Sequence, residues 1–251
     1  MPTDRFDHLT ERLRHLGGQR VWSLMVSLFG DLTLEKEHSI DGPTLSAVME
    51  SLHIKPEATR VALHRLRNDG WIISEKTGRI SHHRLSNKGR AESLAASPRI
   101  YAAPDMRPTN WQMILMPDST DLPGFTPVTA RLWIGAADQP TPAGALCLRG
   151  EAVPEWLRQN IEPATLREGY GALLDTLQTL ESTLPDPEKL IDQERAVLRC
   201  LIVHNWRRLV LKHPSLPASL YSPDWPGHAC HQLVFDLLTL IPRPTLEEPA
   251  A

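Results

Sequence analysis

A short basic segment has the residue types that bind nucleic-acid phosphates and base edges. Residues 58–72 read ATRVALHRLRNDGWI, in which three arginines and a histidine follow a helical pattern that ends at Asp-Gly-Trp. At about 100° per residue, Arg60, His64 and Arg67 fall in one sector of this helix, and Thr59, Ala62, Leu63 and Leu66 share a neighbouring one. The segment therefore predicts a helix with one side packed on the protein and the other free to enter a DNA groove.

The charge distribution concentrates positive charge in the same region. The whole chain of 251 residues has a formal net charge of -3, but residues 55–90 contain nine Lys and Arg against three Asp and Glu. A phosphate-binding surface requires such a local excess. A solvated basic face is the simpler reading, and charge alone favours it.

The position of each basic residue on the helix predicts its role. A recognition helix presents its N-terminal turns to base edges, where the expected readers are Lys55, Thr59, Arg60 and His64. Arg65 and Arg67 are expected to contact the phosphate backbone.

Two short helices joined by a tight turn precede the segment 71–86. Residues 44–52 have an apolar stripe at helical spacing, and Pro56 suits the first turn of the basic helix because its missing N–H costs nothing there. Helices are also predicted over 7–16 and 19–30, the first stopped by Gly-Gly. The pattern is the outline of a helix-turn-helix.

A basic hairpin follows the basic helix. WIISEK and RISHHRLS flank a Thr-Gly turn, which places Lys76 and Arg79 at the hairpin tip and Arg84 farther along the strand. The expected contact is with phosphates or the minor groove, and an ordinary charged turn is the alternative. His82 and His83 are adjacent and should point to opposite faces, which argues against a metal site. Helices and hairpin together predict a winged helix-turn-helix.

The rest of the chain predicts an α+β protein with several parts. Brief apolar runs at 111–150 predict strands, leucine spacing after Glu155 predicts helices, and Ser86 is the expected N-cap of one further helix. The expected divisions are 1–96 as a DNA-binding domain, 97–109 as a linker, 110–152 as a small α+β domain, 153–241 as a helical effector and dimerisation domain, and 242–251 as a tail.

Composition excludes several classes of protein. No apolar run approaches the ~18 residues that span a membrane, and three scattered cysteines form no disulfide framework, so a cytoplasmic protein is expected. Phosphate-loop, dinucleotide-binding and nucleophile-elbow motifs are absent, so no catalytic residues and no cofactor are expected. A thioesterase or hydrolase activity in the C-terminal part is the distant alternative.

Three segments carry a family resemblance. They read SLMVSLFGD, TRVALHRLRNDGWI and, most specifically, RCLIVHNWRRLVLKHPSLPASLYSPDWPG. The chain resembles the PaaX family over about residues 20–241. The resemblance implies a winged-helix domain, a ferredoxin-like middle domain and a helical C-terminal domain. It also implies a homodimeric repressor of a phenylacetate catabolic operon, released from double-stranded operator DNA by an aryl-CoA thioester such as phenylacetyl-CoA. A regulator that answers to another acyl-CoA or to a protein partner is the alternative.

The sequence departs from this pattern in the middle domain. Only residues 118–123 separate Pro117 from Gly124, too few for a packed helix of ~11 residues. The first helix of the ferredoxin-like unit is therefore expected to be missing, and the domain to be truncated.

The HNWRRLVLK segment contains the basic residues best suited to bind a coenzyme A thioester. The candidate effector-binding residues are Trp206, Arg207, Arg208 and Lys212. The alternative is that Trp206 belongs to the core and the arginines hold the following loop. His204 is expected to be a hydrogen-bonded core histidine, and the cluster of His228, Cys230 and His231 is expected to bind no metal because too few further ligands are in view.

Overall fold

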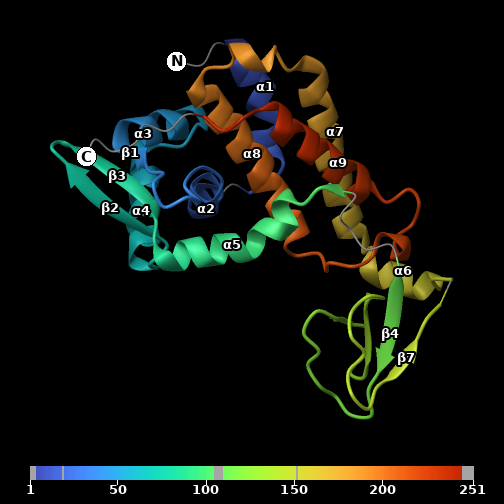
Figure 1. Cartoon of the computed structure of the whole chain (residues 1–251). Coiled ribbons are helices and arrows are strands. Elements are labelled where there is room, and N and C mark those ends of the chain that lie inside the picture. The colour runs from blue at the N-terminus through green and yellow to red at the C-terminus, as the bar shows by residue number, and fades with distance from the viewer. Residues whose placement is uncertain (1–3, 19, 105–109, 151, 245–251) are drawn as a thin grey trace.

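The computed structural model describes residues 4–18, 20–104, 110–150 and 152–244. Within these ranges the chain forms α-helices and two small antiparallel sheets, which confirms the predicted α+β class. Figure 1 shows a helical body with a hairpin projecting from one side and a separate lobe of strands at the opposite end. No helix in the described ranges has the length and apolarity to cross a membrane.

The N-terminal part contains five helices and a three-stranded sheet. The elements are α1 (Asp4–His15), α2 (Val21–Leu32), β1 (Ile40–Asp41), α3 (Gly42–Ser51), α4 (Pro56–Asn68), β2 (Ile72–Thr77), β3 (Ile80–Leu85) and α5 (Asn87–Tyr101). The strand order is β1-β3-β2, with Thr77 opposite Ile80 at the hairpin end. Gly78 has a φ of 62°, which glycine adopts without steric cost in this turn.

The turn between α3 and α4 is unusually tight. His53 has a φ of 59°, and the N–H groups of His53 and Ile54 donate to carbonyls of α3, at 2.9 Å to Glu50 and 3.0 Å to Met49. This is the arrangement in which glycine commonly ends a helix, here with histidine in the left-handed conformation. The His53 ring lies 2.8 Å from an Asp7 carboxylate oxygen on α1, so a polar contact accompanies the strained residue. The turn fixes the direction in which α4 leaves α3.

α5 extends farther than the sequence predicts. Residues 97–101, expected to begin the linker, form its last turn even though Pro98 lies inside it. The reason is tertiary: Arg99 donates to carbonyls at the end of α8 (Asp192–Val210), and the Ile100 carbonyl accepts a 3.0 Å hydrogen bond from Trp206 Nε1. Residues 105–109 of the predicted linker lie outside the described ranges. Ser86 caps α5 as expected, with Gly89 N–H donating to its hydroxyl at 3.0 Å.

The middle lobe is a four-stranded antiparallel sheet. Its strands are β4 (Trp111–Leu115), β5 (Thr126–Pro127), β6 (Leu132–Ala136) and β7 (Leu146–Leu148), in the order β5-β6-β4-β7. No helix lies between β4 and β5, where the sequence leaves no room for the first helix of a ferredoxin-like unit. The expectation of an α+β unit is wrong, since residues 110–150 contain no helix at all. The prolines and glycines that separate the strands leave no run long enough for one.

The C-terminal part is helical, as predicted. Its helices are α6 (Glu155–Ile161), α7 (Ala164–Thr183), α8 (Asp192–Val210) and α9 (Pro226–Leu240), with short 3-10 turns at Pro187–Lys189 and Ala218–Leu220. Every residue of α8 from Ala196 to Trp206 is buried, so this helix is surrounded by the others (Figure 1).

A buried ion pair joins the N-terminal and C-terminal parts. Asp31 of α2 is fully buried, and its carboxylate accepts hydrogen bonds from Arg199 of α8 at 2.7 and 2.8 Å. Tyr101 donates to the same carboxylate at 3.0 Å, and burial beside Asp31 raises the pKa of the Tyr101 hydroxyl. Residues 1–96 and 153–241, predicted as separate domains, therefore share one continuous core through α2 and α8.

Candidate nucleic-acid interface

One side of α4 is packed and the other is in solvent. Ala62 and Leu66 are buried, whereas Arg60 and His64 are exposed, as the helical spacing predicts. Thr59 is also buried, and its hydroxyl donates to the Lys55 carbonyl at 3.4 Å. The prediction that Thr59 reads base edges is therefore wrong, because its side chain belongs to the packed side.

The exposed arginines of α4 make only weak local ion pairs. Arg60 lies 3.0 Å from Glu57, with both side chains nearly three-quarters exposed, and Arg65 lies 3.5 Å from Asp69. Exposed pairs contribute about 0–1 kcal/mol, so a phosphate can replace the carboxylate at little cost. Arg67 is exposed and has no ion-pair partner among the described residues.

Two aromatic rings lie behind the exposed side of α4. The guanidinium of Arg65 lies 5.5 Å from the centre of the Trp22 ring, and Trp22 meets Trp71 edge-on at 6.0 Å. The Trp71 N–H donates to the Leu66 carbonyl at 2.8 Å, and its carbonyl accepts from Ser86 N–H at 2.9 Å. Trp71 therefore fixes both the end of α4 and the base of the hairpin.

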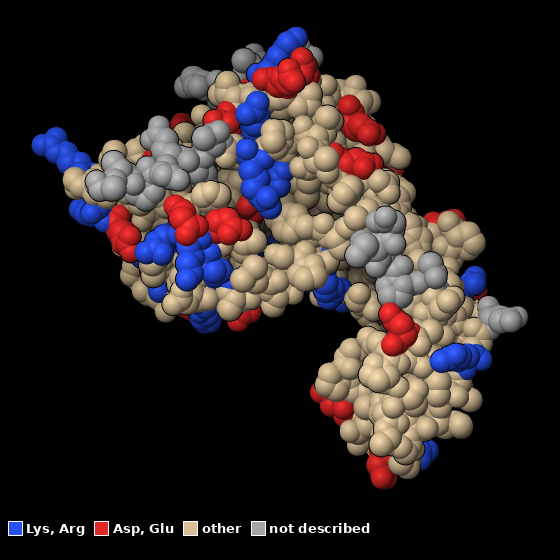
Figure 2. Space-filling model, viewed as in Figure 1, with Lys and Arg blue, Asp and Glu red and all other residues tan. Residues whose placement is uncertain are grey.

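The hairpin adds cations at its tip. Lys76 and Arg79 flank the Thr77–Gly78 turn and are exposed, as predicted, with no ion pair among the described residues. Arg84 instead pairs with Glu75 across the strands at 2.7 Å and is two-thirds buried, so it lies along the hairpin and away from the tip. Figure 2 shows Lys and Arg at the hairpin tip and on the neighbouring surface, with Asp and Glu among them.

The adjacent histidines of β3 have different environments. His83 is buried, and its Nδ1 lies 2.7 Å from the Ser74 hydroxyl. Burial, followed by the charges of Arg67 and His82, lowers the pKa of His83. His82 is only half-buried, as expected for alternate faces of a strand. No metal-binding group of three His, Cys, Asp or Glu side chains occurs in the described part of the chain.

Two further residues lie on the exposed side of α4, and neither is among the residues expected to contact DNA. Val61 is 70% exposed, and Glu57 lies one turn before it on the same stripe as Arg60 and His64. The signal was present in the sequence, because residues at i, i+3, i+4 and i+7 share one helical face. An exposed valine between basic residues has the chemistry that contacts a thymine methyl group.

The four candidate effector-binding residues do not form one site. Trp206 is fully buried against Tyr170 and His231, so the alternative assignment to the core is the correct one. The Arg208 guanidinium packs on Gly17, between α1 and α2, and Lys212 is exposed beyond the end of α8. Arg207 points instead toward α2 and α5, where it donates to the Ser27 hydroxyl at 3.2 Å.

The other histidines and cysteines of the C-terminal part have structural contacts. His204 is buried with Nδ1 3.2 Å from the Ser27 hydroxyl, and burial together with Arg208 and Arg207 lowers its pKa to about 4. His231 is buried, and its Nε2 lies 2.8 Å from the Ala102 carbonyl. Burial raises the pKa of the Cys230 thiol to about 12, so it is a thiol at neutral pH.

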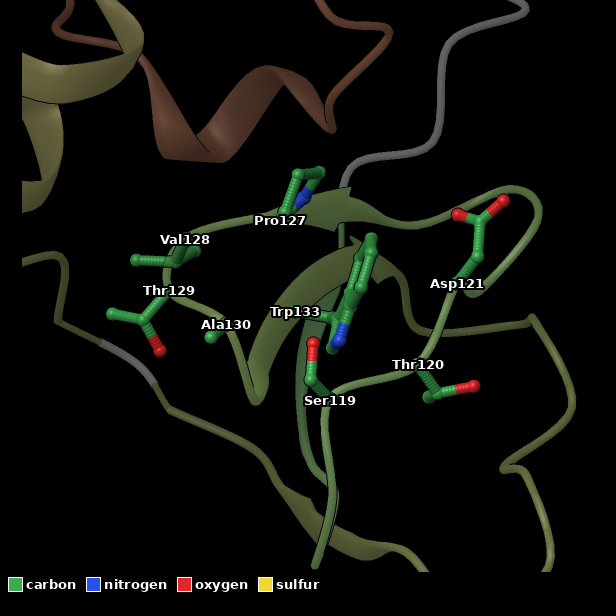
Figure 3. A pocket seen from close by; sticks show the side chains of 8 residues that line it. All are labelled: Ser119, Thr120, Asp121, Pro127, Val128, Thr129, Ala130 and Trp133. Carbon is green, nitrogen blue, oxygen red and sulfur yellow. The ribbon is translucent and has the colours of Figure 1, made fainter.

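A hollow of about 640 Å³ lies in the middle lobe, far from α4. Trp133 stands between the loop with Asp121 and the loop with Val128 (Figure 3), and its ring N–H is buried without a hydrogen-bond partner among the described residues. The hollow is lined by Ser119, Thr120, Asp121, Pro127, Val128, Thr129, Ala130 and Trp133. None of these side chains is a cation, so the hollow does not suit an anionic ligand.

Comparisons with known proteins agree with the resemblance seen in the sequence. Residues 20–89 match the family described as PaaX-like protein, and residues 162–244 match the family described as PaaX-like protein C-terminal domain. The chain is 28% identical over 248 residues, covering 86% of this chain and 78% of the relative, to the Transcriptional repressor PaaX of Escherichia coli (strain K12). In fold, it is similar to an uncharacterized protein from Mycobacterium tuberculosis, with a TM-score of 0.53, 21% identity, and coverage of 87% of this chain and 94% of that one. The two matched regions together span more than half of the sequence, and the chain therefore belongs to the PaaX-like family.

Proposed function

We propose that this PaaX-family protein is a transcriptional repressor whose α4 enters the major groove of operator DNA. The observation that carries the proposal is the exposed basic side of α4, which follows a tight turn after α3 and precedes a hairpin with a basic tip. This is the order of elements in a winged helix-turn-helix. The curated relative is named a transcriptional repressor, which supports the same role here.

The exposed residues of α4 and of the hairpin have different proposed roles in binding DNA. Arg60 and His64 lie on the N-terminal turns of α4 and are the proposed base readers, with Lys55 beside them at the N-cap. Arg65 and Arg67, near the C-terminal end, are proposed to contact phosphates. Lys76 and Arg79 extend the contact from the hairpin tip, while Arg84, held by Glu75, contributes least.

We further propose that two copies bind a pseudo-palindromic site and that an aryl-CoA thioester such as phenylacetyl-CoA releases them. A symmetric dimer places two recognition helices one or more turns of DNA apart. The thioester acts only if its affinity differs between the DNA-bound and released geometries. The proposed target is an aromatic-acid catabolic operon, and the alternative effectors are another acyl-CoA or a protein partner.

A binding titration tests the proposal. Fluorescence anisotropy of the full chain with DNA from upstream of its own gene, and with random DNA of equal length, should give affinities that differ by at least ~10³-fold. Equal affinities would contradict the repressor assignment. The titration is then repeated with phenylacetyl-CoA, with phenylacetamide plus free CoA as the matched control. If the thioester changes nothing, the effector assignment fails and the repressor assignment stands.

A further inference from the structure

A cavity of about 250 Å³ lies between the N-terminal and C-terminal parts of the protein. It is bounded by α2, α5 and α8, and its lining includes Val26, Ser27, Ser97, Ile100, Val203 and Arg207. Most of these side chains are aliphatic or small, and one is a cation. A small concave space with apolar walls and one convergent charge is the usual form of a ligand site.

The cation in this cavity lacks a charged partner. Arg207 Nη1 donates to the Ser27 hydroxyl at 3.2 Å, and no carboxylate lies within 4 Å of it among the described residues. Burial is the main influence on Arg207 and lowers its pKa. A desolvated guanidinium bonded only to a hydroxyl is costly, and an anion in the cavity would offset that cost.

Arg199, two turns earlier on α8, shows the arrangement that Arg207 lacks. Its guanidinium is bonded to both carboxylate oxygens of Asp31 and to the carbonyls of Leu238 and Ile241. Glu92 is the one acidic residue lining the Arg207 cavity among the described residues, and its exposed side chain forms no ion pair with Arg207. The position opposite Arg207 is therefore free of a bound carboxylate from the described part of the chain.

We propose that this cavity binds a small organic monocarboxylate. The carboxylate accepts hydrogen bonds from the Arg207 guanidinium, which the Ser27 hydroxyl holds in position, and the apolar body of the ligand lies against Val26, Ile100 and Val203. The volume suits a single ring or a short aliphatic chain.

Other hollows suit this ligand less well. The hollow in the middle lobe has Asp121 and no cation (Figure 3). A groove of about 950 Å³ between α1 and α7 contains Arg12 and Lys189, but both are exposed and Lys189 pairs with Asp186 at 3.8 Å. Exposed cations are hydrated and gain little from a carboxylate, so the Arg207 cavity is the favoured site.

The same cavity reaches the base of the DNA-binding elements. Trp71 lines it and is also hydrogen-bonded to Leu66 of α4 and to Ser86 after the hairpin. Both bonds are made by the Trp71 backbone, and the coupling we propose is that a ligand in contact with Trp71 shifts this residue and with it the junction of α4 and β2. This consequence rests on the proposed function, whereas ligand binding itself does not.

Calorimetric titration of the full chain, without DNA, tests the site. Benzoate, cyclohexanecarboxylate and hexanoate are the probes, and benzamide is the neutral control of the same shape as benzoate. We expect at least one acid to bind and benzoate to bind at least tenfold more tightly than benzamide. Absence of binding by all three acids, or equal binding of benzoate and benzamide, would overturn the proposal.

Variants locate the bound carboxylate. Arg207→Gln should remove the preference for benzoate, and the matched variant Arg208→Gln, one residue along the helix, should retain it. Glu92→Gln should strengthen benzoate binding slightly because it removes a negative charge from the wall. If Arg207→Gln does not fold, Ser27→Ala is used in its place. This variant should weaken the binding of benzoate several-fold and leave the binding of benzamide unchanged. An unaltered preference in the folded variant overturns the assignment to this cavity.

A final measurement separates this inference from the proposed function. Operator affinity is measured with and without saturating benzoate in the wild-type chain. A change in operator affinity indicates that the cavity is coupled to the DNA-binding elements. If the chain binds benzoate and its operator affinity does not change, the proposed coupling is wrong and the carboxylate site stands. Failure of operator binding would leave the carboxylate site intact, because the calorimetry contains no DNA.

Discussion

The arginines of α8 and those of α4 have opposite environments. Arg199 is 4% exposed and donates to a fully buried carboxylate, whereas Arg60 is 73% exposed and shares a surface ion pair with Glu57. Both lie on helices and both have an acidic neighbour within 3.0 Å. The guanidinium of Arg199 maintains the fold, and that of Arg60 is available to a ligand. Whether an arginine maintains the fold or is available to a ligand therefore depends more on its burial than on its residue type or on the presence of an acidic neighbour.

Arg207 falls between these two cases. It is more withdrawn from solvent than Arg60, yet it lacks the carboxylate that Arg199 has. Buried charges without partners are rare in stable folds, and they concentrate at functional sites. Arg199 therefore belongs to a structural ion pair, Arg60 is a proposed DNA contact and Arg207 is a proposed anion site.

The largest expected effect is the loss of the buried pair. Asp31→Ala leaves Arg199 buried without a counter-charge, so the free energy of unfolding should fall by about 3–5 kcal/mol. Urea unfolding followed by circular dichroism measures it. The matched surface change Glu57→Ala should cost less than ~1 kcal/mol. Similar losses for both variants would contradict the contrast between the two regions.

The buried histidine beside Arg207 should make stability depend on pH. The pKa of His204 is about 4 in the folded chain, lowered by burial from the ordinary histidine value of 6.5 that the unfolded chain keeps. As pH decreases, His204 is therefore protonated in the unfolded chain before it is protonated in the folded chain. Its contribution to the free energy of unfolding is fully present above pH 6.5 and is lost as pH decreases toward 4. The loss from this group is at most about 3 kcal/mol. Urea titrations of His204→Gln should show a smaller loss over this range, and the exposed His8→Gln should match wild type.

The exposed arginines should affect DNA binding without affecting stability. Arg60→Ala should reduce discrimination between operator and random DNA by about 1–3 kcal/mol, because a base contact is lost. Arg79→Ala should weaken binding to both DNAs and lower the salt slope by about 1, because a phosphate contact is lost. Anisotropy titrations over a salt series measure both. Unchanged binding in both variants would refute the proposed orientation of α4.

The smallest expected effect concerns the turn that directs α4. His53 adopts a left-handed conformation that suits glycine, so His53→Gly should be about 1 kcal/mol more stable than His53→Ala. Both variants lose the contact with Asp7, so their difference isolates the backbone. Thermal unfolding compares them, and a more stable alanine variant would show that the turn relaxes.

Local sequence patterns determined the elements of the N-terminal part. Helical spacing and Pro56 predicted α4, the Thr-Gly turn predicted the hairpin, and Ser86 predicted the start of α5. These features depend on neighbours in the chain, which is why one sequence suffices for them. The short connection after Pro117 likewise predicted the missing helix, because chain length alone limits what can form there.

Tertiary structure decided which side chains are available. Helical spacing already places Thr59 beside Leu66 on the packed side of α4, but only the packing shows that the Thr59 side chain is buried there and that Trp206 belongs to the core. The pairing of Asp31 with Arg199 and the helical end of α5 depend on contacts between segments more than 100 residues apart. Burial and long-range pairing arise only when helices pack together. For the same reason Arg207 looked like its neighbour Arg208 in the sequence, and only the packing of α2, α5 and α8 placed it in a cavity.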